Sequence, residues 1–136
     1  MIEDHAEQLT AGLVRDLERH PRLGGYHRLP TSELHDRAYD VYHNLSKWVV
    51  RGSESDVELT YTDLGRRRYR EGIPLSEVIF ALLLTKEHLL EYVRTSGLSD
   101  TALDLYQELE LNQIVSQFFD KAIYHAARGV ELARGF

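Results

Sequence analysis

The positions of its three prolines constrain the fold of this 136-residue chain more than any other feature. Pro21, Pro30 and Pro74 all fall at breaks, and between the breaks hydrophobic residues recur every three or four positions. Proline removes a backbone donor and clashes with the preceding helical turn, so the stretches without it can form uninterrupted helices. No alternating strand pattern, repeat or low-complexity stretch is present. The sequence therefore predicts an all-α fold.

The hydrophobic spacing divides the chain into helical segments at about 3–20, 32–50, 53–72, 75–95 and 99–134. Acidic residues gather in the first turns and basic residues near the ends, which is the polarity that the helix macrodipole favours. The short gaps between segments suit antiparallel neighbours. We therefore expect one domain over residues 1–136, an antiparallel helical bundle of about five helices with a long C-terminal helix.

Two local features of this bundle can be predicted in advance. Gly72 follows a helix and precedes Pro74, so we expect it to end that helix with a positive φ. The large apolar side chains at helical spacing should form the core, and the residues expected to be largely buried are Trp48, Leu82, Leu83, Phe118 and Phe119.

Composition excludes several classes of protein. The chain has no Cys, which excludes a disulfide scaffold, a Cys zinc site and thiol catalysis. Its longest apolar run, residues 78–84, is far too short to cross a bilayer, and the N-terminus lacks the features of a signal peptide. We therefore expect a cytoplasmic protein that does not enter a membrane.

The last segment is longer than the bundle that it belongs to. About 34 residues of helix span roughly 50 Å, whereas the diameter of a compact domain of this size is near 36 Å. Part of its apolar seam therefore needs a cover, and small residues along it would let another helix approach closely. We expect a homodimer whose interface contains Ala122, Ile123, Ala126, Gly129, Val130 and Ala133. The alternative is a monomer in which the first segment folds back along the overhang.

A dense run of positive charge covers residues 65–70, with four arginines among six residues. Such a run can form an anion or nucleic-acid patch. The chain is acidic overall, with a formal net charge of −6, and the arginines fall at the end of a predicted helix. Complementation of the helix dipole and salt bridges explain them there, so we expect no nucleic-acid partner.

Seven histidines invite a search for a metal or a haem. Asp36, Asp40 and His43 share a helix face, but no second helix offers the Glu-x-x-His that a carboxylate-bridged metal pair requires, and we predict no metal site. Haem needs a single axial ligand, and the weak candidates are His43, His88 and His125. The sequence has no nucleophile elbow, phosphate-binding loop or dinucleotide fingerprint, so we predict no enzyme activity and no resident cofactor.

Three stretches together resemble a known family. They are residues 64–79, which contain Gly72-Ile73-Pro74-Leu75-Ser76-Glu77-Val78, the leucine-rich segment up to Tyr92, and residues 118–131. They are similar to the N-terminal helical domain of the RsbT co-antagonist RsbRD, and the similarity extends over residues 5–133. The resemblance implies a bacterial sensory or regulatory input module without enzymatic activity, connected to stress-response regulation. It supplies no ligand residues.

The resemblance and the residues lead to one expected function and one alternative. We expect a signal-transduction input module that dimerises, acts through protein–protein contacts and passes a conformational signal through its last helix. The sequence shows no output domain after Phe136, which leaves open a lone module or a piece of a longer protein. We expect a second copy and a downstream signalling domain or protein as partners. The alternative is a sensor that binds a small molecule or haem inside the bundle.

Overall fold

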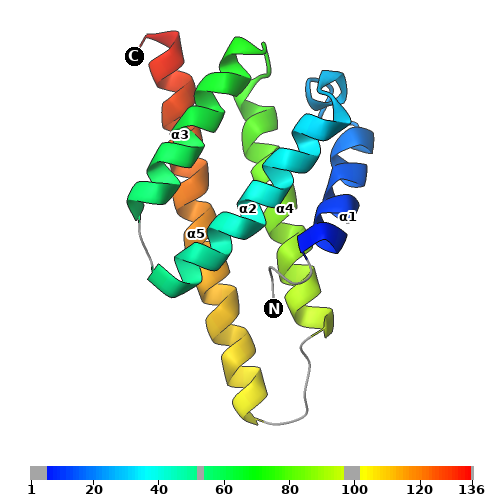
Figure 1. Ribbon diagram of the computed structural model, residues 1–136, viewed down its shortest axis with the longest axis vertical. Helices are drawn as coiled ribbons and strands as arrows, with labels where there is room; N and C mark the ends of the chain where they lie inside the picture. The colour runs from blue at the N-terminus through cyan, green and yellow to red at the C-terminus, as the bar shows by residue number, and fades with distance from the viewer. Residues whose placement is uncertain (1–5, 52–53, 97–101, 136) are drawn as a thin grey trace.

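The structure is a computed structural model that describes residues 6–51, 54–96 and 102–135. These residues form five α-helices and one short 3-10 helix: α1 (Ala6–Arg19), η2 (Tyr26–Arg28), α2 (Thr31–Arg51), α3 (Glu54–Arg70), α4 (Leu75–Ser96) and α5 (Ala102–Arg134). Consecutive helices run in opposite directions, and α5 extends along the length of the molecule (Figure 1). The predicted all-α bundle with a long C-terminal helix is confirmed. The helix starts predicted at residues 3–5, 53 and 99–101 lie outside the described residues.

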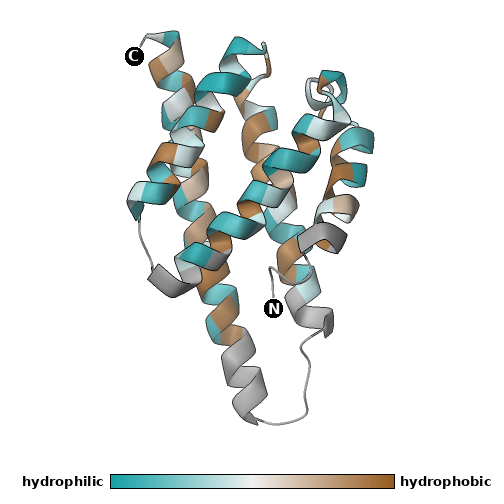
Figure 2. Ribbon diagram, in the orientation of Figure 1, coloured by the Kyte–Doolittle hydropathy of each residue, from teal (hydrophilic) through white to brown (hydrophobic). Residues whose placement is uncertain are grey.

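The helices bury one face each. Hydrophobic residues gather where helices meet, whereas the outward side of α2 is mainly hydrophilic (Figure 2). One continuous core joins α1 to α5, from Leu13 and Leu34 near one side to Val115 and Phe118 near the other. Phe118 packs edge-on against Tyr61 and Phe119, at ring-centroid distances of 5.9 and 5.2 Å. The contact between Tyr61 and Phe118 helps to fix the position of α5 against α3.

The predicted core residues are placed correctly except on one helix face. Leu82, Phe118 and Phe119 are buried, as predicted, and Trp48 is partly buried against the core. The prediction for Leu83 is wrong, because its side chain is 40% exposed. Helix α4 is apolar around most of its circumference, and neighbouring residues on a helix point about 100° apart. The inward side of α4 here holds Ala81 and Leu82, and Leu83 lies one step further around the helix, on the side exposed to solvent.

The turn between α3 and α4 has the predicted form. Gly72 has a φ of +76°, which confirms the left-handed conformation expected there. The Ile73 amide donates to the Arg68 carbonyl and the Gly72 amide to the Tyr69 carbonyl, both at 3.0 Å. These bonds satisfy the last carbonyl groups of α3. The helix η2 was not predicted, because a single turn after Gly24-Gly25 carries no periodic signal.

Candidate functional site

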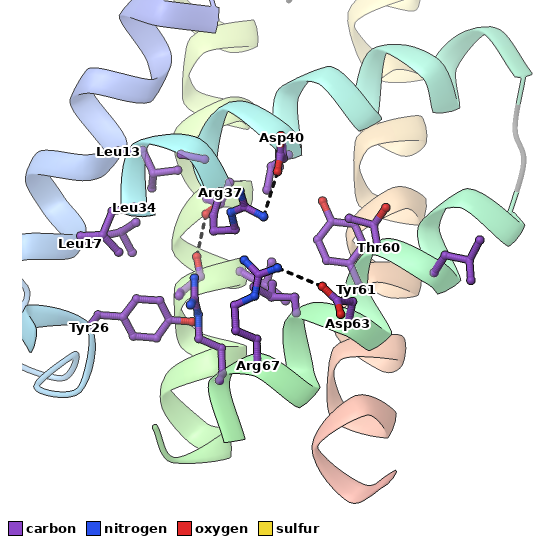
Figure 3. A pocket seen from close by; sticks show the side chains of 18 residues that line it. Leu13, Leu17, Tyr26, Leu34, Arg37, Asp40, Thr60, Tyr61, Asp63 and Arg67 are labelled. Carbon is purple, nitrogen blue, oxygen red and sulfur yellow. Dashed lines mark hydrogen bonds and ion pairs between the residues drawn. The ribbon is translucent and has the colours of Figure 1, made fainter. Parts of the chain in front are cut away.

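A pocket lies between the first four helices, with a volume of about 330 Å³. Its lining residues come from α1, η2, α2, α3 and α4, and α5 contributes none of them. Figure 3 shows the leucines of α1 and α2 on one side of the pocket and Thr60 and Tyr61 of α3 on the other. Most of the α3 residues in the lining therefore face away from α5, and Tyr61 touches both the pocket and Phe118 of α5.

Most of the pocket wall is apolar. Leu13, Leu17 and Leu34 are buried in it, and Val41 and Leu82 complete the wall. Leu59 also lines the pocket but is 72% exposed, so it marks the side that opens to solvent. An apolar concave wall with a few polar groups is the usual form of a small-molecule site.

Arg68 brings a positive charge into the core beside this wall. Its side chain is only 1% exposed and donates to Glu33 at 3.0 Å and to Glu71 at 2.8 Å. Its guanidinium also lies 5.3 Å from the centre of the Tyr26 ring. Burial by itself lowers the pKa of Arg68, but Tyr26 and the carboxylates more than offset this, and the pKa is raised. The arginine is therefore charged, and its partners make its burial tolerable.

Two further arginines stand at the mouth of the pocket, and Figure 3 shows each beside an aspartate. Arg37 contacts Asp40 at 3.3 Å, and Arg67 donates to Asp63 at 3.1 Å. Both arginines also lie within 4 Å of Glu33, at 3.8 and 3.4 Å. Glu33 is thus the common partner of three arginines from α2 and α3, and it ties the two helices together at the pocket.

Three hydrogen-bond donors on the pocket wall remain without a partner among the described residues: Arg37 Nε, Arg68 Nε and the Tyr61 hydroxyl. Arg37 Nε lies 3.8 Å from the Glu33 carboxylate, too far for a hydrogen bond. Asn44 and Asp40 lie near the Tyr61 hydroxyl, but it makes no hydrogen bond of good geometry. Burial raises the pKa of Tyr61, so this hydroxyl keeps its proton at neutral pH and can donate.

The opposite face of α3 packs directly on α5. A Cβ placed on Gly65 would lie 2.0 Å from the Ala126 carbonyl oxygen, and one placed on Gly129 would lie 2.2 Å from the Thr62 carbonyl oxygen. Side chains never approach backbone oxygens so closely, so only glycine fits at either position. The two backbones touch at this crossing, and α3 cannot move there without α5.

The contact with α3 corrects the predicted interface. The small-residue stripe does admit a close helix, but that helix is α3 of the same chain. Ala122, Ala126, Gly129 and Val130 are buried against the fold, and Ile123 and Ala133 are partly buried. At Ala126 and Gly129 the expected cover by a second copy or the first segment is wrong, because α3 already lies against them. At Ile123 and Ala133, which are only partly buried, it stays a prediction. Dimerisation itself stays a prediction.

The three haem candidates lie apart from the pocket. His88 contacts Asp16 across α4 and α1, and His125 contacts Glu54 at 3.2 Å at the start of α3. His43 is exposed on α2. No histidine lines the pocket in the part of the chain that is described. The structure therefore does not gather these residues into one site.

The arginine run and the acidic residues have structural partners. Arg67 and Arg68 form the ion pairs described above, as the salt-bridge interpretation of the run predicts.

Among the described residues, no group of three or more His, Asp or Glu side chains is placed to hold a metal ion. In the same described ranges, no helix combines the length and the apolarity needed to span a membrane.

The sequence did not reveal the pocket. Its lining comes from four helices and η2, and no local motif marks which arginines would turn inward. One signal was available in the sequence. The last turn of α3 carries more arginines than are needed to complement the helix dipole, but their partners Tyr26 and Glu33 lie outside that helix. Only the packing of α2 against α3 shows that these groups meet.

The fold and the pocket define an all-α domain with a small half-open pocket bordered by ion-paired arginines. The chain belongs to the family of the RsbT co-antagonist protein rsbRD N-terminal domain, whose model matches residues 3–135. This is a family of signalling domains and not one of known enzymes, so the chain takes part in signal transduction. No curated protein and no solved structure matched the chain.

Proposed function

We propose that this domain is a non-enzymatic input module of stress-response signalling, in which a small molecule in the pocket changes the position or the rigidity of α5. The observation that carries the proposal is the double role of α3. One face of α3 lines the pocket, with Thr60 and Arg67, and the other face is locked on α5 at Gly65. A ligand that shifts α3 must therefore shift α5 or break their contact.

The pocket favours the small-molecule alternative over haem. Its wall offers arginine and tyrosine donors and apolar side chains, and the histidine candidates lie elsewhere. Its carboxylates, Asp40 and Asp63, are engaged with arginines rather than placed as an acid–base pair. These features support binding without chemistry.

The proposed transmission can be tested before the ligand is known. Ala38 lines the pocket and is buried, so Ala38→Leu would fill part of the space that a ligand takes. Hydrogen exchange should then become slower at the amides of both α3 and α5, although α5 does not touch the pocket. The control is Leu83→Phe, which adds volume on the exposed side of α4. Slower exchange in α3 with no change in α5 would contradict the proposal.

Dimerisation is part of the proposal, on a face that α3 leaves open. Tyr124 and Leu132 on α5 are 58% and 39% exposed. A two-fold dimer pairs one surface with itself, and contact through α5 would bring both C-terminal helices together. Light scattering at tens of micromolar should give a dimer for the native chain and a monomer for Tyr124→Glu with Leu132→Glu. Leu83→Glu is the control on α4, and a monomeric native chain would sink the idea.

A further inference from the structure

The surface that the pocket presents to solvent is mainly apolar. On α3, Leu59 and Leu64 both line the pocket and keep accessible surface. The other helices supply a nearly buried floor, in which Leu17, Val41 and Ala81 are each 5% or 6% exposed. The three donors without a partner are buried and do not reach this surface. A molecule that enters the pocket therefore meets mostly hydrocarbon.

The charged side chains of the lining are matched with partners of opposite charge. Arg37 contacts Asp40 at 3.3 Å, and Arg67 contacts Asp63 at 3.1 Å. Arg68 is paired with the two glutamates described above. Every arginine and aspartate that lines the pocket thus has a partner. A charged ligand of either sign would have to separate an existing pair or leave its own charge unpaired, and both are costly near an apolar wall.

The uncharged polar side chains of the lining have little to offer a ligand. The Thr85 hydroxyl donates to the Ala81 carbonyl within α4, at 2.7 Å. Tyr61 is 1% exposed, so its hydroxyl lies behind the wall. Among the uncharged polar side chains of the lining, Thr60 keeps the most accessible surface. One threonine can satisfy one polar group of a ligand, such as a hydroxyl or a carbonyl.

The volume limits the size of the ligand. An apolar cavity of about 150 Å³ is large enough to hold benzene. This pocket has about 330 Å³, and its side near Leu59 is open to solvent. A single ring with a short alkyl substituent, or an alkyl chain of similar size, therefore fits, whereas a long lipid does not.

We propose that the pocket binds a small uncharged apolar molecule, of the size of an alkylbenzene, that carries at most one hydroxyl or carbonyl group. Its body lies on the floor formed by α1, α2 and α4 and against Leu59 and Leu64 of α3. This inference deepens the proposed function by naming the ligand class of the same pocket, and it rests on that pocket being the sensory site.

The test compares three probes of similar size in NMR titrations of the native chain, followed by the shifts of the leucine methyl groups. Ethylbenzene is uncharged, benzylammonium has the same shape with a positive charge, and benzoate is negative. Ethylbenzene should bind saturably and about tenfold more tightly than either ion, because a charge gains no partner on the wall. From toluene to ethylbenzene to propylbenzene, the affinity should rise about fourfold with each buried methylene group.

Two variants locate the binding in this pocket. Ala38→Leu fills part of the space and should weaken the binding of ethylbenzene about tenfold, whereas Leu83→Phe, on the exposed side of α4, should leave it unchanged. Leu59→Gln removes apolar contact at the opening and should weaken binding about threefold. Leu59 is 72% exposed, so this variant keeps the fold, and its matched control is Leu109→Gln on α5, where the leucine is 60% exposed.

Three results would overturn the proposal. The first is that ethylbenzene does not bind saturably, and the second is that either ion binds as tightly as ethylbenzene. The third is that each pocket variant binds ethylbenzene like its control.

The outcomes also separate the ligand class from the signalling role. If ethylbenzene binds as expected but leaves hydrogen exchange in α5 unchanged, the ligand class stands and the transmission through α3 fails. If Ala38→Leu slows exchange in α5 and ethylbenzene does not bind, the transmission stands and the ligand class fails.

Discussion

Helix α3 meets its neighbours very differently on its two sides. Against α5 the backbones touch, and a single added Cβ at Gly65 would lie 2.0 Å from an oxygen. Toward α1, α2 and α4 the side chains leave a space of about 330 Å³ with donors that lack partners. One helix can therefore connect two kinds of region. The loosely filled region can respond to a ligand, and the tightly packed region can transmit the response.

The largest expected effect comes from the tight side. Gly129→Ala places a Cβ 2.2 Å from the Thr62 carbonyl oxygen, so both helices must separate. We expect a loss of about 4 kcal/mol or more in the free energy of unfolding, measured by urea denaturation. Gly12→Ala is the control, since a Cβ there meets nothing within 4 Å, and it should stabilise by up to about 1 kcal/mol. Equal changes in the free energy of unfolding for the two variants would contradict the tight packing of α3 on α5.

The second-largest effect concerns α4, which borders both the pocket and the tightly packed region. Leu89 is fully buried, and Leu89→Ala should cost about 3 kcal/mol because it leaves a cavity in the core. Leu83→Ala should cost less than about 1 kcal/mol, since that side chain is 40% exposed. Denaturation midpoints of the two variants measure the difference. A larger loss for Leu83→Ala would show that the outer face of α4 is covered.

Adding volume should have opposite signs on the two sides of α3. Ala126→Leu overpacks the contact with Gly65 and should cost about 2 kcal/mol. Ala38→Leu enters the pocket and should stabilise by up to about 1 kcal/mol, because it fills existing space. The melting temperatures of the two variants test this prediction. A lower melting temperature in both would mean that the pocket side of α3 is packed as tightly as the side that faces α5.

The turn after α3 gives a smaller effect. Gly72 has a φ of +76°, which costs a residue with a Cβ about 1–2 kcal/mol, so Gly72→Ala should destabilise by that amount. Gly24→Ala is the control, because Gly24 has open space and no positive φ. A higher melting temperature for Gly72→Ala would contradict the assigned cap.

The smallest effect is a pH dependence at the start of α3. The hydrogen bond from His125, followed by the charge of Lys121, lowers the pKa of Glu54. Glu54 therefore stabilises the fold above the ordinary pKa of a glutamate, and this stabilisation is lost as the pH falls through the lowered value. Glu54→Gln should reduce stability slightly at pH 7 and less at about pH 3. Glu58→Gln, at an exposed position of the same helix, is the control for removing one negative charge from α3.

The sequence predicted what local signals encode. Helix limits follow from prolines, glycines and hydrophobic spacing, and the φ of Gly72 follows from its place between a helix and Pro74. The small residues Ala126 and Gly129 correctly predicted a closely packed helix, but we expected that helix to come from another chain. Small residues determine how closely a helix can pack and not which helix packs there. The pocket was not predictable, since the inward turn of Arg37 and Arg68 depends on how α2 and α3 pack.

The glycine contact between α3 and α5 also sets the order in which the chain can fold. Gly65 and Ala126 are separated by about sixty residues, so their contact closes a long loop, and the entropy of that closure must be overcome before the contact contributes. A chain synthesised from its N-terminus exposes this face of α3 until nearly all of α5 has left the ribosome. The face of α3 on which only glycine fits is therefore the last one to be covered during synthesis.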